Sequence, residues 1–176
     1  MIFQDTRIPG VTLIRSEPVE DERGLFARTF CEREFAARDL AARFVQCNVS
    51  FNFRAGTLRG MHYQSEPKPE PKLVRCTKGA IYDVALDLRP GSPTYCCWEA
   101  FELTERNRAA LYIPPGCAHG FQTLVDGSEV FYQMGEFYDP TLSAGVRWND
   151  SSFSITWPIE NPILSDRDRS YGDFER

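Results

Sequence analysis

The feature that most limits the fold is a series of short apolar runs between residues 44 and 134, most of them bounded by Gly, Pro, Asp or Asn. Runs of this length that are bounded by turn-forming residues are typical of β-strands. The runs are Phe44–Phe53, Thr57–Gln64, Lys72–Leu88, Tyr95–Leu103, Ala109–Ile113, Ala118–Val125 and Ser128–Met134. Residues 81–88 alternate with a period of two, which is the period of a strand. Many short strands at this spacing predict an all-β sandwich or barrel.

The N-terminal part of the chain adds two shorter strand-like segments, Val11–Val19 and Leu25–Phe30. Between them and the first long run, Cys31–Ala42 is rich in Glu, Ala and Arg, a composition that favours one short helix. The 176 residues suffice for one domain with a substantial core. The most proline-dense stretch, residues 66–71, is too short to divide domains. We therefore expect residues 1–176 to form a single domain.

Charge and cysteine usage exclude several classes of function. Lys plus Arg number 20 and Asp plus Glu 25, so the net charge is −5, which argues against a nucleic-acid-binding protein. No apolar run approaches the roughly 18 residues of a membrane-spanning helix, and the first residues lack the apolar region of a secretion signal. We expect a cytoplasmic protein that does not bind membranes. Its six cysteines form no CxxC pair, so we expect reduced, mostly buried thiols and no zinc site.

Histidine is scarce in this chain. His62 and His119 are its two histidines, within the compact motifs Arg59–Gln64 and Pro114–Phe121. From the sequence alone, either one is a hydrogen-bonded core residue or a functional group. A catalytic metal site usually needs three protein ligands, and two histidines far apart in the chain do not supply such a cluster. We therefore expect no metal ion.

Five further polar residues stand out by their context, namely Lys72, Tyr132, Arg23, Arg59 and Asp168. Lys72 begins an apolar run, where a lysine is either a solvated strand end or a buried cation. Tyr132 has apolar residues at alternating positions and should point inward, as a core residue or as an acid catalyst. Arg23 and Arg59 each adjoin a glycine, which lets backbone and guanidinium approach an anion together. These residues suggest reacting groups but no particular reaction.

Several longer motifs follow one another along the chain: Gly56–Gln64, Lys72–Arg75, Asp83–Pro93, Ile113–Phe121, Tyr138–Pro140 and Arg147–Asp150. In their residues and their order, the chain resembles the dTDP-4-dehydrorhamnose 3,5-epimerase family from about Arg23 to Asp168. The resemblance implies a cupin-like double-stranded β-helix, or jelly roll. It also implies a homodimer in which an N-terminal strand is exchanged.

The resemblance further implies an epimerase that acts on a nucleotide-diphosphate 4-keto-6-deoxy sugar and needs neither metal nor redox cofactor. Such an enzyme inverts C3, C5 or both by proton removal and return through an enolate. Four positions match the family's catalytic groups: His62 as the base, Asp168 as its partner, Lys72 beside the C4 oxygen, and Tyr132 as the acid on the opposite face. The family's substrate-binding positions match Arg23, Phe26, Arg28, Gln46, Asn48, Arg59 and His119.

Three departures from the family pattern concern substrate recognition, and one of them is the loop Phe51–Arg54, which is one residue longer than the common form. Arg28 and Ser143 each occupy a position where the family usually has Glu, and the first of these lies near the nucleotide. The identity of the base therefore stays open. One local geometry also needs explanation, since Arg59 and His62 would face opposite sides of a regular strand. Gly60 between them is a suitable place for a bulge that re-aims one of them.

Two other functions are compatible with the same residues. A related cupin ketoisomerase would move the keto group and leave the carbon configurations unchanged. A non-catalytic module would only bind the sugar nucleotide. The joint presence of His62, Lys72, Tyr132 and Asp168 argues against the non-catalytic module, and the sequence context of the two histidines favours an epimerase.

Overall fold

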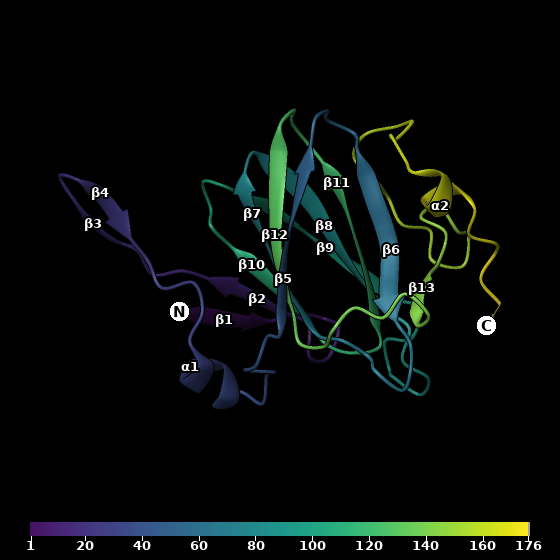
Figure 1. Cartoon of the computed structure of the whole chain (residues 1–176), viewed down its shortest axis with the longest axis horizontal. Coiled ribbons are helices and arrows are strands. Elements are labelled where there is room, and N and C mark those ends of the chain that lie inside the picture. Colours follow the sequence, from purple (N-terminus) through teal and green to yellow (C-terminus); the bar gives the residue numbers. More distant parts are fainter. Residues whose placement is uncertain (176) are drawn as a thin grey trace.

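A computed structural model describes residues 1–175, whose strands form two large antiparallel sheets that face each other (Figure 1). The first sheet has 6 strands, in the order β1 (Ile2–Asp5), β2 (Thr12–Arg15), β10 (Ala110–Ile113), β7 (Lys72–Lys78), β12 (Ser128–Met134) and β5 (Gln46–Asn52). The second has 5 strands, in the order β13 (Ser143–Gly145), β6 (Leu58–Gln64), β11 (Cys117–Thr123), β8 (Ala80–Asp87) and β9 (Trp98–Thr104). The predicted all-β jelly roll is confirmed.

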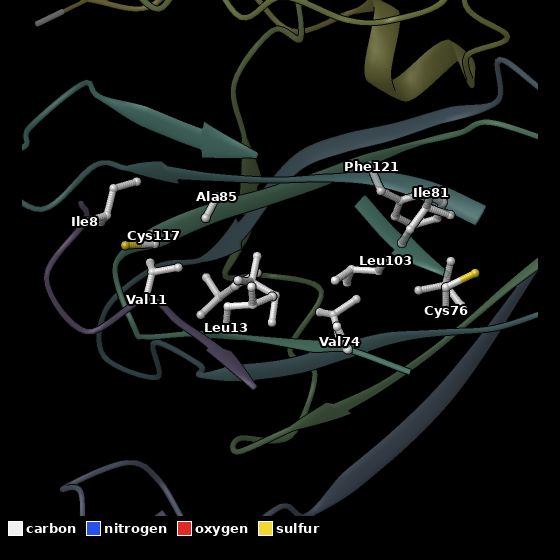
Figure 2. Close-up of a cluster of buried hydrophobic side chains, with 14 residues drawn as sticks. Ile8, Val11, Leu13, Val74, Cys76, Ile81, Ala85, Leu103, Cys117 and Phe121 are labelled. Carbon is white, nitrogen blue, oxygen red and sulfur yellow. The ribbon is translucent and has the colours of Figure 1, made fainter. Parts of the chain in front are cut away.

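The main core lies between the two sheets. Leu111 is opposite Val74 in the first sheet, and Ile81 is opposite Leu103 in the second. Because directly opposed residues share a face, each pair points to one side of its sheet, and all four side chains are fully buried. Figure 2 shows Val74 of the first sheet facing Ile81 and Phe121 of the second. The apolar residues that alternate along these strands therefore form the core between the two sheets.

A second core covers the outer face of the second sheet. Val84 and Leu86 of β8 point to that face and pack with Phe153 and Ile155 of the C-terminal segment. The indole of Trp98 donates a hydrogen bond to the Phe153 carbonyl at 3.0 Å, which fastens this segment to β9. Both faces of β8 are therefore buried. The same segment continues into the short helix α2 (Asp166–Arg169), which contacts β6.

The outer face of the first sheet is partly covered by α1 (Glu32–Ala36). Phe35 is completely buried there, with its ring centroid 5.4 Å from that of Phe3 and 6.3 Å from that of Tyr112. The helix is shorter than the predicted Cys31–Ala42, because the chain leaves the helical conformation before Asp39, which has a φ of 56°. None of the helices within residues 1–175 is long and apolar enough to cross a membrane.

A small hairpin of β3 (Val19–Asp21) and β4 (Gly24–Phe26) projects from the body of the molecule (Figure 1). Phe26 is 77% exposed and Val19 is 71% exposed. A hairpin of two strands has little stability of its own, and Val19 is directly opposite Phe26, so their exposed apolar side chains adjoin each other as they do on interaction surfaces.

Three local expectations need correction. The run Lys72–Leu88 is two strands, since Gly79 with a φ of 77° turns the chain between β7 and β8. Cys96 lies in a turn before β9, with a φ of 64°, and not in a strand. All six cysteines are free, but Cys76 and Cys117 are the buried ones, whereas the other four are partly or fully exposed.

Candidate active site

A cavity of about 550 Å³ is lined by residues of both sheets and of α2. Six of the predicted site residues line it, namely Arg59, His62, Lys72, His119, Tyr132 and Asp168. A neighbouring cavity of about 300 Å³ shares His62, Lys72 and Tyr132 and adds Gln46 and Asn48. The structure thus brings together every predicted site residue except those at positions 23, 26 and 28.

The three exceptions lie on or next to the projecting hairpin. Arg23 pairs with Asp21 inside the hairpin, and Phe26 is among the most exposed apolar residues. Arg28 follows β4 and forms an ion pair with Glu34 at 3.2 Å. These residues do not line either cavity of their own chain.

Arg59 and His62 reach the same cavity because β6 is irregular between them. His119 of β11 is opposite His62 while Phe121 is opposite Arg59, so three steps on β6 match two on β11. The irregularity includes Gly60, which has a φ of 134°. A Cβ on Gly60 would lie 2.5 Å from the Cα of Gly120, so only glycine fits there. The expected bulge is confirmed.

His62 and Asp168 form a close pair at the base of α2. Nε2 of His62 lies 2.6 Å from Oδ1 of Asp168, and the backbone N–H of Gly60 donates to the other carboxylate oxygen at 3.4 Å. Burial alone would raise the pKa of Asp168, but hydrogen bonds from His62, Gly60 and Ser165 outweigh it and lower this pKa. An ionised Asp168 accepts the proton on Nε2, which leaves Nδ1 of His62 as the basic nitrogen.

Ser165 explains why a charged C-terminal stretch enters the site. It caps α2, and its hydroxyl accepts a hydrogen bond from the backbone N–H of Asp168 at 3.1 Å. The cap fixes the first turn of the helix, so that the carboxylate of Asp168 is directed to β6 and is 4% exposed.

Tyr132 enters the cavity from the opposite sheet. It belongs to β12 of the first sheet, whereas His62 belongs to β6 of the second. Burial raises the pKa of the Tyr132 phenol, the charge of Arg59 opposes this, and the carboxylate of Glu70 adds to it. The hydroxyl therefore keeps its proton at neutral pH and is able to act as an acid.

Lys72 and His119 supply further positive or proton-bearing groups. Nζ of Lys72 lies 3.0 Å from Oε1 of Glu70 and 3.4 Å from the backbone oxygen of His62. Nε2 of His119 lies 2.7 Å from Oδ1 of Asp83, which is completely buried. Arg59 donates from Nε to Asn52 at 2.8 Å. The cavity is therefore well suited to hold an anion.

Sequence reasoning missed two residues of this site that have clear contacts. Glu70 lines the second cavity but lies in the proline-rich loop, where a carboxylate is normally a solvated charge. Arg167 lines both cavities, donating to the Ser143 hydroxyl at 2.7 Å and to the Tyr171 hydroxyl at 3.0 Å. The signal for Arg167 was its place directly before Asp168 in the sequence.

No group of three or more His, Cys, Asp or Glu side chains within residues 1–175 is placed to hold a metal ion. The site instead combines an imidazole with a carboxylate partner, a buried ammonium and a protonated phenol around one cavity. A jelly roll with this set of groups is suited to moving a proton on and off carbon, which is the chemistry of one class of isomerase.

Comparison with known proteins gives the family. The chain matches the family model of dTDP-4-dehydrorhamnose 3,5-epimerase over residues 5–176. It is 43% identical over 164 residues to the dTDP-4-dehydrorhamnose 3,5-epimerase of Shigella flexneri, covering 93% of this chain and 90% of that protein. It is 39% identical over 163 residues to a dTDP-4-dehydrorhamnose 3-epimerase of Streptomyces niveus, covering 92% of this chain and 78% of that protein.

A solved structure agrees with these relatives. The dTDP-4-dehydrorhamnose 3,5-epimerase of Bacillus anthracis, crystallised with TDP and PPi bound, superposes with a TM-score of 0.95 at 39% identity. The match covers 98% of this chain and 99% of that one. This chain belongs to the dTDP-4-dehydrorhamnose 3,5-epimerase family, whose members are carbohydrate epimerases.

Proposed function

We propose that His62, Asp168, Lys72 and Tyr132 together epimerise a thymidine-diphosphate 4-keto-6-deoxy sugar in the larger cavity. The observation that carries this proposal is the placement of His62 and Tyr132 on opposite sheets around one cavity. A base and an acid that approach a carbon from opposite sides invert its configuration. The ammonium of Lys72, which lines the same cavity, stabilises negative charge on the sugar.

The C4 ketone makes the protons on C3 and C5 acidic, because the electron pair released by either carbon is delocalised onto the C4 oxygen. Nδ1 of His62 takes the proton, and the ketone becomes an enolate whose oxygen meets the ammonium of Lys72. Tyr132 then gives its hydroxyl proton to the same carbon from the other side, and the ketone forms again. The phenolate regains a proton from solvent, and the imidazolium releases one. Asp168 stabilises the imidazolium meanwhile.

The remaining cavity residues would bind the substrate. Arg59 and His119 are the cationic or proton-bearing groups beside the catalytic set, which suits a diphosphate. Gln46 and Asn48 line the smaller cavity and offer amide groups for sugar hydroxyls. Arg23, Phe26 and Arg28 lie away from their own cavity, so they meet a substrate only in the cavity of another subunit.

A homodimer is therefore part of the proposal. The projecting hairpin carries two of those residues together with exposed apolar side chains, as a contact with a second subunit requires (Figure 1). We also propose that the protein works in the cytoplasm, since its six cysteines are all free. Its length of 176 residues suits a single domain.

The decisive experiment is incubation with dTDP-4-keto-6-deoxyglucose in D₂O, followed by NMR of the sugar. Deuterium at an inverted C3, C5 or both supports the proposal and shows which carbons react. A ketone at C3 in place of C4 would instead show a ketoisomerase. Tight binding without deuterium uptake would show a non-catalytic sugar-nucleotide module.

A further inference from the structure

Glu70 is a buried carboxylate to which the proposed mechanism gives no role. Its side chain is 5% exposed, and its Oε1 lies 3.0 Å from Nζ of Lys72. Its Oε2 is buried and has no hydrogen-bond partner within residues 1–175. Within the same residues, Lys72 is the one ion-pair partner of Glu70. A buried charge is costly unless it is paired, so the two residues depend on each other.

The contacts of Lys72 leave one of its hydrogens for the substrate. An ammonium carries three N–H donors on a flexible stem. One donor points to Oε1 of Glu70 at 3.0 Å and a second to the backbone oxygen of His62 at 3.4 Å. With these two acceptors fixed, the third N–H is held in one direction. Lys72 lines both cavities, so a sugar bound there would meet the one N–H that these two acceptors leave free.

The loop that carries Glu70 is fixed on both sides. The side-chain amide of Gln64 donates to the carbonyl of Lys68 at 2.7 Å, and the backbone N–H of Gly135 donates to the carbonyl of Pro71 at 3.0 Å. A Cβ on Gly135 would lie 2.4 Å from the Pro71 ring, so the end of β12 packs directly on the loop. The prolines of this loop also restrict its backbone. Glu70 thus has the stiff support that a positioning group needs.

We propose that Glu70 is a positioning residue that aims the Lys72 ammonium at the carbonyl oxygen of the sugar. The inference rests on the proposed function, because it acts through the cation that stabilises the enolate. Glu70 does not need to touch the substrate itself. Its loss should therefore affect the rate of enolate formation more than substrate binding.

The test is a double-mutant cycle of Glu70→Ala and Lys72→Met, read out as deuterium exchange into the sugar. We expect Glu70→Ala to slow exchange about tenfold with little change in KM, less than the loss of a whole stabilising donor. Glu70→Gln keeps an oxygen acceptor for the ammonium and should stay within about threefold of the wild-type rate. In the Lys72→Met background, Glu70→Ala should slow exchange no further and should raise Tm, because it removes an unpaired buried carboxylate.

Two results would overturn the role of Glu70 alone: a wild-type exchange rate for Glu70→Ala, or equal slowing with and without Lys72. Failure of the proposed function looks different. A wild-type exchange rate for Lys72→Met would show that Lys72 does not stabilise the enolate. The inference about Glu70 would then fail as well, whatever the Glu70 variants do.

Discussion

His62 and His119 lie directly opposite each other on the antiparallel strands β6 and β11. Opposed residues share a face of their sheet, and both imidazoles line one cavity. Each has its own carboxylate, Asp168 at 2.6 Å and Asp83 at 2.7 Å. Their exposure differs, with 32% for the side chain of His62 and 10% for that of His119. The more exposed imidazole exchanges protons with water more readily, which favours His62 as the base.

Replacing His62 by Ala should abolish deuterium uptake and leave the fold intact. The side chain faces a cavity and does not pack the core, and the Gly60 N–H still donates to Asp168. Exchange measured by NMR, with circular dichroism for the fold, checks this expectation. His119→Ala is the matched control, which should weaken binding and stability but keep measurable exchange. Near-normal exchange by His62→Ala would contradict the assignment of the base.

Tyr132→Phe should lose inverted product more than proton abstraction. The acid acts after the base, so deuterium can still enter from the His62 side without inversion. The measurement compares deuterium uptake with the amount of epimerised sugar. Equal loss of both would show that Tyr132 has a structural role only.

The pH dependence of the wild type gives a second check on Tyr132. Burial raises the pKa of its phenol, so the acid form persists above the ordinary value of about 10. Inversion that needs this proton is present below that pH and is lost as the pH rises through the raised pKa. If inversion is instead lost as the pH rises through neutrality, a group other than Tyr132 is the acid.

The sequence predicts the strands well because each one is specified locally. In β8, which contains Ile81, alternating residues pack into two different cores. The period of two is therefore visible in the sequence although both faces of the strand are apolar. The pairing that brings His62 opposite His119 is a long-range contact, which no local pattern specifies. Only the structure shows this pairing, whereas the bulge at Gly60 was predicted from the sequence because glycine lies between Arg59 and His62.

The structural setting of other site residues could not be predicted from local sequence patterns, for physical reasons. The charged stretch around Asp168 is typical of a solvated tail, and only the cap by Ser165 and the contact of α2 with β6 bring it inside. Glu70 is buried because a proline-rich loop folds under the cavity. No pattern showed that Phe26 would lie on a hairpin away from the cavities of its own chain.

Thiol labelling tests the packing of the β-sheets. Burial raises the pKa of Cys117 to about 12 and that of Cys76 to about 11, whereas Cys97 is exposed. Because the thiolate is the reactive form, iodoacetamide at pH 8 should label Cys97 quickly and the two buried thiols only after unfolding. Mass spectrometry of the peptides measures this. Equally fast labelling of Cys117 in the native protein would contradict its burial.

Subunit complementation tests whether the hairpin serves a second subunit. Arg23→Ala and His62→Ala should each be inactive as homodimers. In a mixed dimer, the Arg23→Ala subunit retains His62 and receives the intact hairpin of the His62→Ala subunit. One of the two sites is thereby restored. Equal mixing with exchange of subunits should restore about a quarter of wild-type activity. No recovery in a verified mixed dimer would show that the hairpin acts elsewhere.

The last prediction concerns the nucleotide base. Arg28 is 65% exposed and pairs with Glu34 at 3.2 Å, so its guanidinium has donors left for a ligand. By the resemblance to the family, its position is one where a carboxylate near the nucleotide is expected. A carboxylate accepts the N3–H of thymine, whereas arginine can only donate, and cytosine offers acceptors at N3 and O2. A mismatched polar contact costs about 1–3 kcal/mol when its groups are buried.

We therefore expect the ratio of dTDP affinity to CDP affinity to be smaller for the wild-type protein than for the Arg28→Glu variant. Calorimetric binding of dTDP, CDP, GDP and UDP to both proteins measures the preference. Arg33→Glu, an equal charge change on the exposed face of α1, is the matched control and should leave the preference unchanged. If wild type and Arg28→Glu prefer dTDP to the same extent, the guanidinium does not read the base. Backbone groups would then set the specificity for thymine.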